Sequence, residues 1–285
     1  MTEPDAAPAA AQAAPESASR NLVMRVVVAA VLIPLAVAIA YYGGWLWAAL
    51  VTAAAIGLFL EWLSVVGLAN ALALQIRGGV ALAVGGICFA AGRIDAALIV
   101  LGLGFISVVW TAPDRRGWAA AGFCYAAAAE IASVLLRLDP VKGFAALMFV
   151  LVIVWVTDSG GYFAGRGVGG PKLWPRVSPK KTWAGAIGGF AASLAVAGGF
   201  AAFDLGKTVP LLISAAILSV ASQLGDLLES AVKRRFGVKD SSHIIPGHGG
   251  LMDRLDGFVA AVVLAAIFGF LRGGADGVGR GLMVW

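Results

Sequence analysis

Long apolar segments separated by short polar ones run along nearly the whole chain. Between Arg25 and Glu61 no charged residue occurs for 35 positions, whereas one helix needs only about 20 residues to cross a bilayer. Gly43 and Gly44 follow two tyrosines within this stretch and predict a turn between two spans. Further apolar runs follow at about 76–92, 95–112, 118–136, 143–164, 183–204, 208–232 and 255–272. The pattern predicts an all-α integral membrane protein, a polytopic bundle of about nine transmembrane helices.

The composition supports this class. Of the 285 residues, 60% are hydrophobic and 13% are charged, whereas a soluble domain carries about 25% charged residues. This excludes a soluble enzyme, a disordered regulator and a nucleic-acid-binding domain. The formal charge of +5 fits cytoplasmic loops that face anionic headgroups, and no nucleic-acid partner is expected. Cys88 and Cys124 lie in apolar runs, so neither a disulfide framework nor a cysteine metal site is available.

Three regions follow from this layout. Residues 1–20 hold eight Ala and three Pro without the basic start of a signal peptide, which predicts a disordered cytoplasmic tail. Residues 21–140 form an N-terminal transmembrane region that is poor in polar groups. Residues 141–285 form a catalytic transmembrane region, because most chemically able side chains come after Asp158. Glu61 and Glu130 are exceptions, and each is either a functional intramembrane carboxylate or a hydrogen-bonded structural group.

The distribution of basic residues predicts the orientation. With the N-terminus inside, the polar loops 165–182 and 233–254 are cytoplasmic and Trp285 lies on the other side. We therefore expect a multi-pass protein of the inner (plasma) membrane whose active site faces the cytoplasm, because basic residues concentrate in cytoplasmic loops. In this orientation the cytoplasmic segments hold 15 of the 21 Lys and Arg residues, namely Arg20, Arg25, Arg77, Arg115, Arg116, Arg166, Lys172, Arg176, Lys180, Lys181, Lys233, Arg234, Arg235, Lys239 and Arg254.

The densest group of polar side chains begins at the end of the run 208–232. If this helix continues to about Arg235, it is about 42 Å long and reaches the headgroup layer. Asp226, Ser230 and Lys233 then share one face at spacings of four and seven residues. Glu229 points to a different face, and its replacement is expected to cost less. The shared face offers a ligand for a hard cation, a hydroxyl and an ammonium group.

A glycine-rich loop follows and ends at the start of the next helix. Gly247, Gly249 and Gly250 allow backbone N–H groups to approach an anion, and the helix N-terminus adds its positive dipole end. Asp253 and Asp256 share a face of that helix. Together with Asp226 they predict three converging carboxylates of the kind that Mg²⁺ uses beside phosphates. A glycine turn flanked by snorkelling basic residues, without any chemistry, is the alternative.

Two motifs dominate the second half of the chain. One runs from Ser230-x-x-Lys233-Arg234 through Lys239-Asp240 to Pro246-Gly247-His248-Gly249-Gly250-x-x-Asp253-Arg254-x-Asp256. The other is Asp158-Ser159-Gly160-Gly161-Tyr162-Phe163-Ala164-Gly165-Arg166, followed by Ser178-Pro179-Lys180-Lys181-Thr182-Trp183. Both closely resemble the signature of phosphatidate cytidylyltransferases, also called CDP-diacylglycerol synthases. The resemblance covers about residues 150–272, and the first 140 residues match only as a hydrophobic multi-span region.

The resemblance implies a reaction between CTP and phosphatidate that gives CDP-diacylglycerol and pyrophosphate. It also implies Mg²⁺, in some members a monovalent cation such as K⁺, and a homodimer with a polar cavity open to the cytoplasm. One departure is that Ala184 stands where the second motif usually has Glu, which leaves no acidic role at that position. The side chains present are suited to this reaction, because joining two charged phosphates depends mainly on positioning and charge neutralisation.

Carried onto matching positions, the resemblance implies that Asp226 and Asp253 hold the metal pair and that Asp256 supports it. Ser230 and Lys233 would contact phosphate groups, and Lys233 joins these three carboxylates in the catalytic set. His248 is either a phosphate donor or a structural loop residue, and the two loop lysines are either phosphate contacts or topology signals. The remaining substrate-binding candidates are Arg234, Lys239, Asp240, His248, Gly249, Gly250, Arg254, Asp158, Ser178, Lys180 and Lys181.

Two other functions use similar charges. A CTP-dependent lipid kinase of the prenol or dolichol type would transfer the terminal phosphoryl group instead of the cytidylyl group. A transporter of anionic lipid or phosphate would use the charges as a pathway, but such proteins usually show repeated halves with binding groups near the membrane midplane. No internal repeat is visible here, and the polar groups gather at one interface.

Overall fold

The computed structural model describes residues 30–112, 114–242 and 249–285. Within these ranges, eight helices are long and apolar enough to cross a membrane. A shorter apolar helix, Ala30–Tyr42, precedes them at the start of the described residues. The all-α, membrane-embedded fold is therefore confirmed, and the shorter helix lies where the first of the nine predicted spans was expected. The predicted tail 1–20 lies outside the described residues.

The long helices agree with the predicted spans except at their ends. The helix Leu72–Ala90 begins earlier than the predicted run 76–92, and within it Arg77 Nη1 donates to Thr111 Oγ1 of the next helix at 2.8 Å. The helix that was expected to reach Arg235 does end there. The eight helices are α2 (Gly44–Val65), α3 (Leu72–Ala90), α4 (Ile94–Thr111), α5 (Arg116–Leu138), α6 (Gly143–Gly167), α7 (Trp183–Ala202), α8 (Thr208–Arg235) and α9 (Met252–Gly273).

The turn predicted at Gly43 and Gly44 is present. Both glycines have positive φ values, 67° and 55°, which side chains rarely adopt. Arg137 from the end of α5 covers the turn, and its Nη2 donates to Tyr41 O at 2.7 Å. A Cβ atom at Gly43 would lie 2.6 Å from that nitrogen. Glycine at this position therefore serves both the backbone conformation and the close approach of Arg137.

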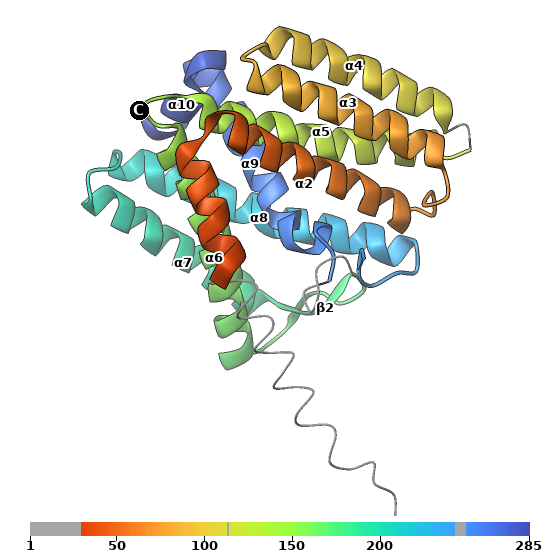
Figure 1. Ribbon diagram of the computed structural model, residues 1–285. Coiled ribbons are helices and arrows are strands. Elements are labelled where there is room, and N and C mark those ends of the chain that lie inside the picture. Colours follow the sequence, from red (N-terminus) through yellow and green to blue (C-terminus); the bar gives the residue numbers. More distant parts are fainter. Residues whose placement is uncertain (1–29, 113, 243–248) are drawn as a thin grey trace, which may run out of the picture.

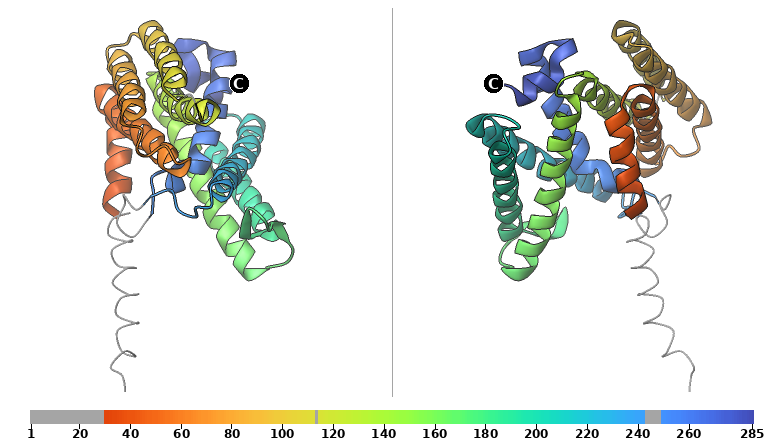
Figure 2. Two further views of the ribbon diagram at one scale, coloured as in Figure 1. Left: turned by 90° about the vertical axis from the view of Figure 1, so that its right-hand side faces the viewer. Right: turned by 60° about the vertical axis from the view of Figure 1, so that its left-hand side comes forward.

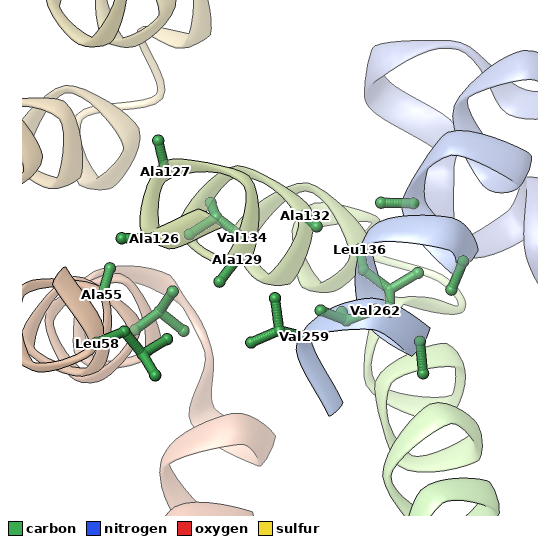
Figure 3. Close-up of a cluster of buried hydrophobic side chains, with 14 of the residues drawn as sticks. Ala55, Leu58, Ala126, Ala127, Ala129, Ala132, Val134, Leu136, Val259 and Val262 are labelled. Atoms are coloured by element: carbon green, nitrogen blue, oxygen red, sulfur yellow. The ribbon is translucent and has the colours of Figure 1, made fainter. Parts of the chain in front are cut away.

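Small side chains form the centre of the bundle between α2, α5 and α9. Figure 3 shows that Ala55 and Leu58 of α2 face α5, while Val259 and Val262 of α9 approach α5 from another direction. Small residues at such contacts let helix backbones come close. Close packing drives helix association in a membrane, because lipid tails are as apolar as the side chains and burial gives no hydrophobic gain. The α5 residues labelled in this cluster are Ala126, Ala127, Ala129, Ala132, Val134 and Leu136.

Two helix pairs form opposite flanks of the molecule. The α3–α4 pair lies on one flank and the α6–α7 pair on the other (Figures 1 and 2). Glycines bring α6 and α7 together: a Cβ atom at Gly189 would lie 2.4 Å from Thr157 O, and one at Gly185 would lie 2.8 Å from Gly161 O. The glycines of the second sequence motif therefore include helix-packing residues that fix the distance between these two helices.

The polar segment between α6 and α7 contains a short β hairpin instead of an irregular loop. Strand β1 (Lys172–Trp174) pairs antiparallel with β2 (Ser178–Thr182). The hairpin leads directly into α7, whose first turn is capped because Gly185 N donates to Thr182 Oγ1 at 3.0 Å. It therefore carries the lysines of β2 to a fixed place beside α8.

The opposite end of the bundle is closed by the C-terminal segment. A 3₁₀ turn (Ala275–Gly277) and the short helix α10 (Val278–Met283) lie there, at the far end from β2 (Figure 1). Arg280 Nε donates to buried Asp139 Oδ2 at 2.9 Å. Burial opposes ionisation of Asp139, but N–H groups of Lys142, Arg280 and Val141 and the Arg280 guanidinium outweigh it and lower the pKa of this carboxyl.

Candidate active site

Asp226 on α8 is the central acidic residue of the site. It forms a salt bridge with Lys181 of β2, and Ser230 Oγ donates to its Oδ1 at 3.3 Å. The predicted common face of Asp226 and Ser230 is therefore confirmed. The hairpin supplies the ammonium partner, because β2 brings Lys181 onto α8 from a segment 45 residues earlier in the chain.

Two further carboxylates lie close to Asp226. Asp158 on α6 and Asp256 on α9 are near enough that their charges repel each other and that of Asp226. Lys181 is the cation that offsets the charge of both. We call Asp158, Asp226 and Asp256 the cavity carboxylates. Three helices thus direct negative charge toward one place, an arrangement that is unfavourable unless a cation or a strong donor joins it.

A polar cavity of about 420 Å³ adjoins this group, and it is within the range of small-molecule sites. Asp158 and Asp226 lie on its wall together with three basic residues, Arg166, Lys180 and Lys181. Tyr162 also lines it and accepts a hydrogen bond from Arg166 Nη1 at 2.9 Å. The cavity therefore combines acceptors for a cation with donors for an anion.

An apolar groove of about 650 Å³ lies on the other side of the same turn of α8. Its wall is formed by α5, α8 and α9, with Glu229 and Asp256 as its acidic residues. In β1, Leu173 lines the polar cavity whereas Trp174 lines the groove, as expected for neighbouring strand residues that point to opposite sides. Leu224 and Leu228 of the groove are exposed, so in a membrane this groove faces acyl chains.

Glu229 lies on a different face of α8 from Asp226, as predicted, but it still contacts the charged residues around the site. It is 3% exposed, and its Oε1 lies 2.9 Å from Lys233 Nζ. Its carboxyl group also interacts with that of Asp256 across the α8–α9 contact. The helical wheel separates Glu229 from Asp226, and Asp256 of α9 lines the same apolar groove as Glu229. The spacing of four residues between Glu229 and Lys233 was the available signal.

Asp253 does not converge with Asp226 and Asp256 as predicted. Its Oδ1 lies 2.5 Å from Lys233 Nζ, and its Oδ2 accepts hydrogen bonds from Ser241 and from Gly250 N, which lies at 3.0 Å. Within the described residues, no three His, Cys, Asp or Glu side chains are grouped closely enough to hold a metal ion by themselves. The predicted trio is thus divided: Asp226 lines the polar cavity, Asp256 lines the apolar groove, and Asp253 holds the loop.

The N-terminus of α9 holds carboxylates of the protein itself, where the sequence predicted an anionic ligand. Glu61 of α2 accepts hydrogen bonds from Leu251 N at 2.8 Å and Met252 N at 2.7 Å, and Gly250 N donates to Asp253. A Cβ atom at Gly250 would lie 1.8 Å from Ser241 Oγ. The glycine is therefore required by an internal network, and the N–H groups of Gly250, Leu251 and Met252 are already used, while Gly247 lies outside the described residues.

The other predicted residues lie at varying distances from this centre. Arg234 is exposed at the end of α8 and donates to Val238 O at 3.2 Å. Lys239 and Asp240 are exposed beyond α8, and Arg254 is exposed on the first turn of α9. Ser178 begins β2 and lies outside the lining of the polar cavity. Gly249 precedes α9 with a positive φ of 82°, and His248 lies outside the described residues.

The donor set fits a Mg²⁺ ion in its chemistry. Asp226 and Asp256 provide hard oxygen ligands, and their mutual repulsion would be relieved by a divalent cation. Mg²⁺ is usually held by one or two carboxylates, with waters and substrate phosphates completing its shell, so a closed cage of protein ligands is not needed. The absence of a protein-only trio among the described residues is compatible with such a site.

Comparisons with known proteins cover most of the chain. The profile of the cytidylyltransferase family matches residues 23–271, so the similarity extends well before residue 150, where the sequence motifs begin. A phosphatidate cytidylyltransferase of Brucella suis biovar 1 is 42% identical over 258 residues, which is 87% of this chain and 93% of that protein. A phosphatidate cytidylyltransferase of Staphylococcus saprophyticus is 39% identical over 175 residues, 60% of this chain and 67% of that protein.

Proposed function

Because the chain belongs to the cytidylyltransferase family, we propose that it transfers the cytidylyl group of CTP to phosphatidate. The products are CDP-diacylglycerol and pyrophosphate. One observation carries the proposal beyond the names of the relatives: a polar cavity and an apolar groove adjoin the same turn of α8, at Asp226 and Gly225. A water-soluble nucleotide and a lipid need two such compartments that meet at charged groups.

The polar cavity is the proposed nucleotide site. Arg166, Lys180 and Lys181 supply positive charge on its wall, and basic side chains are suited to phosphate oxygens. Its 420 Å³ is in the range of sites that hold small ligands. The triphosphate is assigned to this cavity because Glu61 and Asp253 already use the N–H groups at the start of α9.

The apolar groove is the proposed site of the phosphatidate acyl chains. Its wall is formed mainly by aliphatic side chains of α8 and α9, and Trp174 and Trp62 lie at its edges. Asp256 and Glu229 form its acidic part, and Glu229 contacts Lys233. A lipid in this groove would bring its phosphate to the junction with the nucleotide cavity, where Lys233 is the nearby ammonium group.

Mg²⁺ belongs to the proposal as the cofactor, with a monovalent cation such as K⁺ as a further candidate. Asp226 and Asp256 would hold the divalent ion, and Asp253, which pairs with Lys233 in the structure, is the remaining candidate ligand. When bound, the ion would neutralise charge on the triphosphate and on the pyrophosphate leaving group.

The residues of the chain then act mainly by positioning. The attacking group is a phosphate monoester oxygen, which is already anionic, so no side chain has to remove a proton. This oxygen forms a bond to the α-phosphorus of CTP, and the bond from that phosphorus to the bridging oxygen of pyrophosphate breaks. Lys181 and Lys233 offset the repulsion between the two phosphates, and the hairpin and α8 hold these ammonium groups in place.

The proposal also includes the cellular setting. The protein is embedded in a membrane, and we assign it to the inner membrane with the hairpin β1–β2 facing the cytoplasm, because of the basic residues at this end. We also propose that the protein forms a homodimer, because the resemblance to the family implies one.

Isotope labelling tests the reaction directly. Purified protein in detergent or nanodiscs is given phosphatidate and Mg²⁺ with CTP labelled at the α-phosphorus or at the γ-phosphorus. We expect α-label in the lipid fraction and γ-label in pyrophosphate only, and chelation of Mg²⁺ should stop both. A lipid kinase gives γ-label in lipid and none from the α-position, and a transporter gives no covalent transfer. Either of these results would overturn the proposed function.

A further inference from the structure

We infer that Glu61 of α2 is a positioning residue for the transfer reaction, which it supports by clamping the segment that carries Asp253. The inference rests on the proposed function for the reaction itself, but the clamp can be measured independently of activity. Glu61 lies in the half of the chain that the sequence showed to be poor in chemistry. It is 1% exposed and lines neither the polar cavity nor the apolar groove, so it does not act as a catalytic residue.

The carboxylate of Glu61 has four hydrogen-bond donors around it. Oε1 accepts from Ser242 Oγ at 2.5 Å and from Leu251 N at 2.8 Å, and Oε2 accepts from Ser241 Oγ at 2.8 Å and from Met252 N at 2.7 Å. These donors lie on both sides of the segment 243–248 and 180 to 191 residues from Glu61. Buried acceptor oxygens are costly when they lack donors, and these four donors satisfy both oxygens of Glu61. Glu61 thus fixes both ends of the loop to α2.

The network continues from Glu61 to the site. Ser241 Oγ lies 2.8 Å from Glu61 Oε2 and 3.1 Å from Asp253 Oδ2. Asp253 then contacts Lys233, which also contacts Glu229. An unbroken series of polar contacts therefore runs from α2, through the loop and α9, to α8. We call Glu61 and Asp253 the clamp carboxylates.

Gly250 provides independent support for the clamp. A Cβ atom there would lie 2.7 Å from Glu61 Oε2 as well as 1.8 Å from Ser241 Oγ. The close approach of Glu61 is thus possible only where the loop has no side chain. The negative charge of Glu61 also lies at the positive end of the α9 dipole, which favours the start of the helix at Met252.

The structure suggests which step depends on Glu61. Glu61 touches neither cavity, so its loss should leave the affinity for CTP and phosphatidate nearly unchanged. Its loss should instead let Asp253 and Lys233 move, and a displacement of about 1 Å at a reacting centre costs about 100-fold in rate. We therefore expect a fall in kcat with little change in either KM, with kcat expressed per folded molecule, because loss of folded protein alone would also lower the apparent kcat at constant KM.

The experiment compares Glu61→Gln with Glu130→Gln. Gln at 61 replaces an acceptor oxygen by a donor that faces a backbone N–H group, so kcat should fall about 100-fold. Glu130 is the matched control, since it is fully buried but accepts a single hydrogen bond, from Thr52 Oγ1 at 2.7 Å. Its variant should keep kcat within about twofold. Equal kcat for Glu61→Gln and the wild type, or an equal loss in both variants, would overturn the inference.

Amide hydrogen exchange gives a readout besides activity. In Glu61→Gln the amides of Leu251 and Met252 should exchange faster, while amides in the middle of α9 should keep their protection. Unchanged exchange at Leu251 and Met252 would contradict the clamp. If the wild type fails to transfer α-label, the proposed function is wrong, and this measurement still decides whether Glu61 holds the loop.

Ser242→Ala provides a milder variant in case Glu61→Gln does not fold. It removes one donor to Glu61 and should lower kcat by about tenfold, again without a large change in KM. The double variant should be little worse than Glu61→Gln alone, because both changes remove the same interaction. Strictly additive losses would show that Ser242 and Glu61 act separately and would contradict the clamp.

Discussion

The cavity carboxylates and the clamp carboxylates lie at the same end of the bundle but in opposite surroundings. Glu61 and Asp253 are surrounded by hydrogen-bond donors from the backbone, serines and a lysine. Asp158 and Asp226 lie on the wall of the polar cavity and Asp256 on that of the apolar groove, with Lys181 as the cation that offsets the charge of Asp158 and Asp256. The first group is satisfied by the protein, whereas the second retains unbalanced negative charge beside a cavity.

This difference separates structural acids from ligand-binding acids more clearly than sequence position does. A carboxylate whose oxygens are all used holds the fold, because removing a partner leaves an unsatisfied buried group. A group of repelling carboxylates is unfavourable by itself and becomes favourable when a cation binds. Asp253 belongs to the first group in the structure although it lies only three residues from Asp256. The comparison predicts different consequences for equivalent substitutions in the two groups.

The largest effect is expected for Asp226→Asn. The change keeps the shape of the side chain but removes charge that would hold a divalent cation, so kcat/KM should fall about 10³-fold, equivalent to several kcal/mol. The melting temperature without Mg²⁺ should stay near the wild-type value, and the rise in melting temperature on adding Mg²⁺ should disappear. Activity assays and thermal unfolding in detergent measure both.

Asp95→Asn on α4 is the control for Asp226→Asn, because Asp95 is exposed and pairs with Arg93 far from either cavity. It should leave both readouts unchanged. If Asp226→Asn instead lowered the melting temperature strongly and kept the response to Mg²⁺, Asp226 would belong with the clamp carboxylates and the comparison would be wrong.

A smaller effect is expected for Gly250→Ala, which tests the clamp group from the loop side. The new Cβ atom would overlap Ser241 Oγ, and overpacking of this kind costs about 1–3 kcal/mol of stability. Both the melting temperature and kcat should therefore fall, unlike the effect of Asp226→Asn. Gly198→Ala on α7 is the matched control, since nothing lies within 4 Å of its added Cβ. A Gly250→Ala variant as stable and active as Gly198→Ala would refute the close packing.

The smallest effect concerns Asp139, a satisfied carboxylate at the other end of the bundle. Its pKa is lowered because hydrogen bonds to the ionised form outweigh burial. Its stabilisation is therefore complete above the ordinary Asp pKa of about 3.9 and is lost as the pH falls through the lower folded-state value. Asp139→Asn should reduce stability by about 1 kcal/mol at pH 7. The difference from wild type should shrink in strong acid, as measured by thermal unfolding.

The control for Asp139→Asn is Asp204→Asn, an exposed residue after α7, which should not alter stability at either pH. A difference for Asp139→Asn that stayed constant down to strong acid would contradict the predicted link to ionisation.

The fold was largely predictable because a membrane span is determined by the apolar residues of one continuous segment. Apolar runs, the glycine pair at 43–44 and the continuation of α8 to Arg235 depend on neighbouring residues, and the structure agrees with them. The β1–β2 hairpin was harder to predict from the sequence. Its strands contain three and five residues, too few to give a clear alternation, and β2 includes a proline and two lysines.

The site was predicted in part, and its errors have a common cause. The pairing of Ser230 with Asp226 follows from helical spacing and was found correctly. The partners of Glu61 lie 180 or more residues away, and no local pattern encodes such a contact. The glycine loop was assigned to a phosphate because sequence shows N–H groups that can bind an anion, but not which anion binds them. For the N–H groups of Gly250, Leu251 and Met252, the anions are Asp253 and Glu61.

The alternation of Leu173 and Trp174 has a consequence for how substrates arrive and products leave. One strand forms part of the wall of both compartments, so it stands at the boundary between water and lipid. Under the proposed function, pyrophosphate departs into solvent on one side of this strand, and the lipid product diffuses laterally within its own leaflet on the other. Water-soluble and lipid molecules therefore use separate routes. A CTP molecule bound in the polar cavity does not block release of the lipid product from the groove.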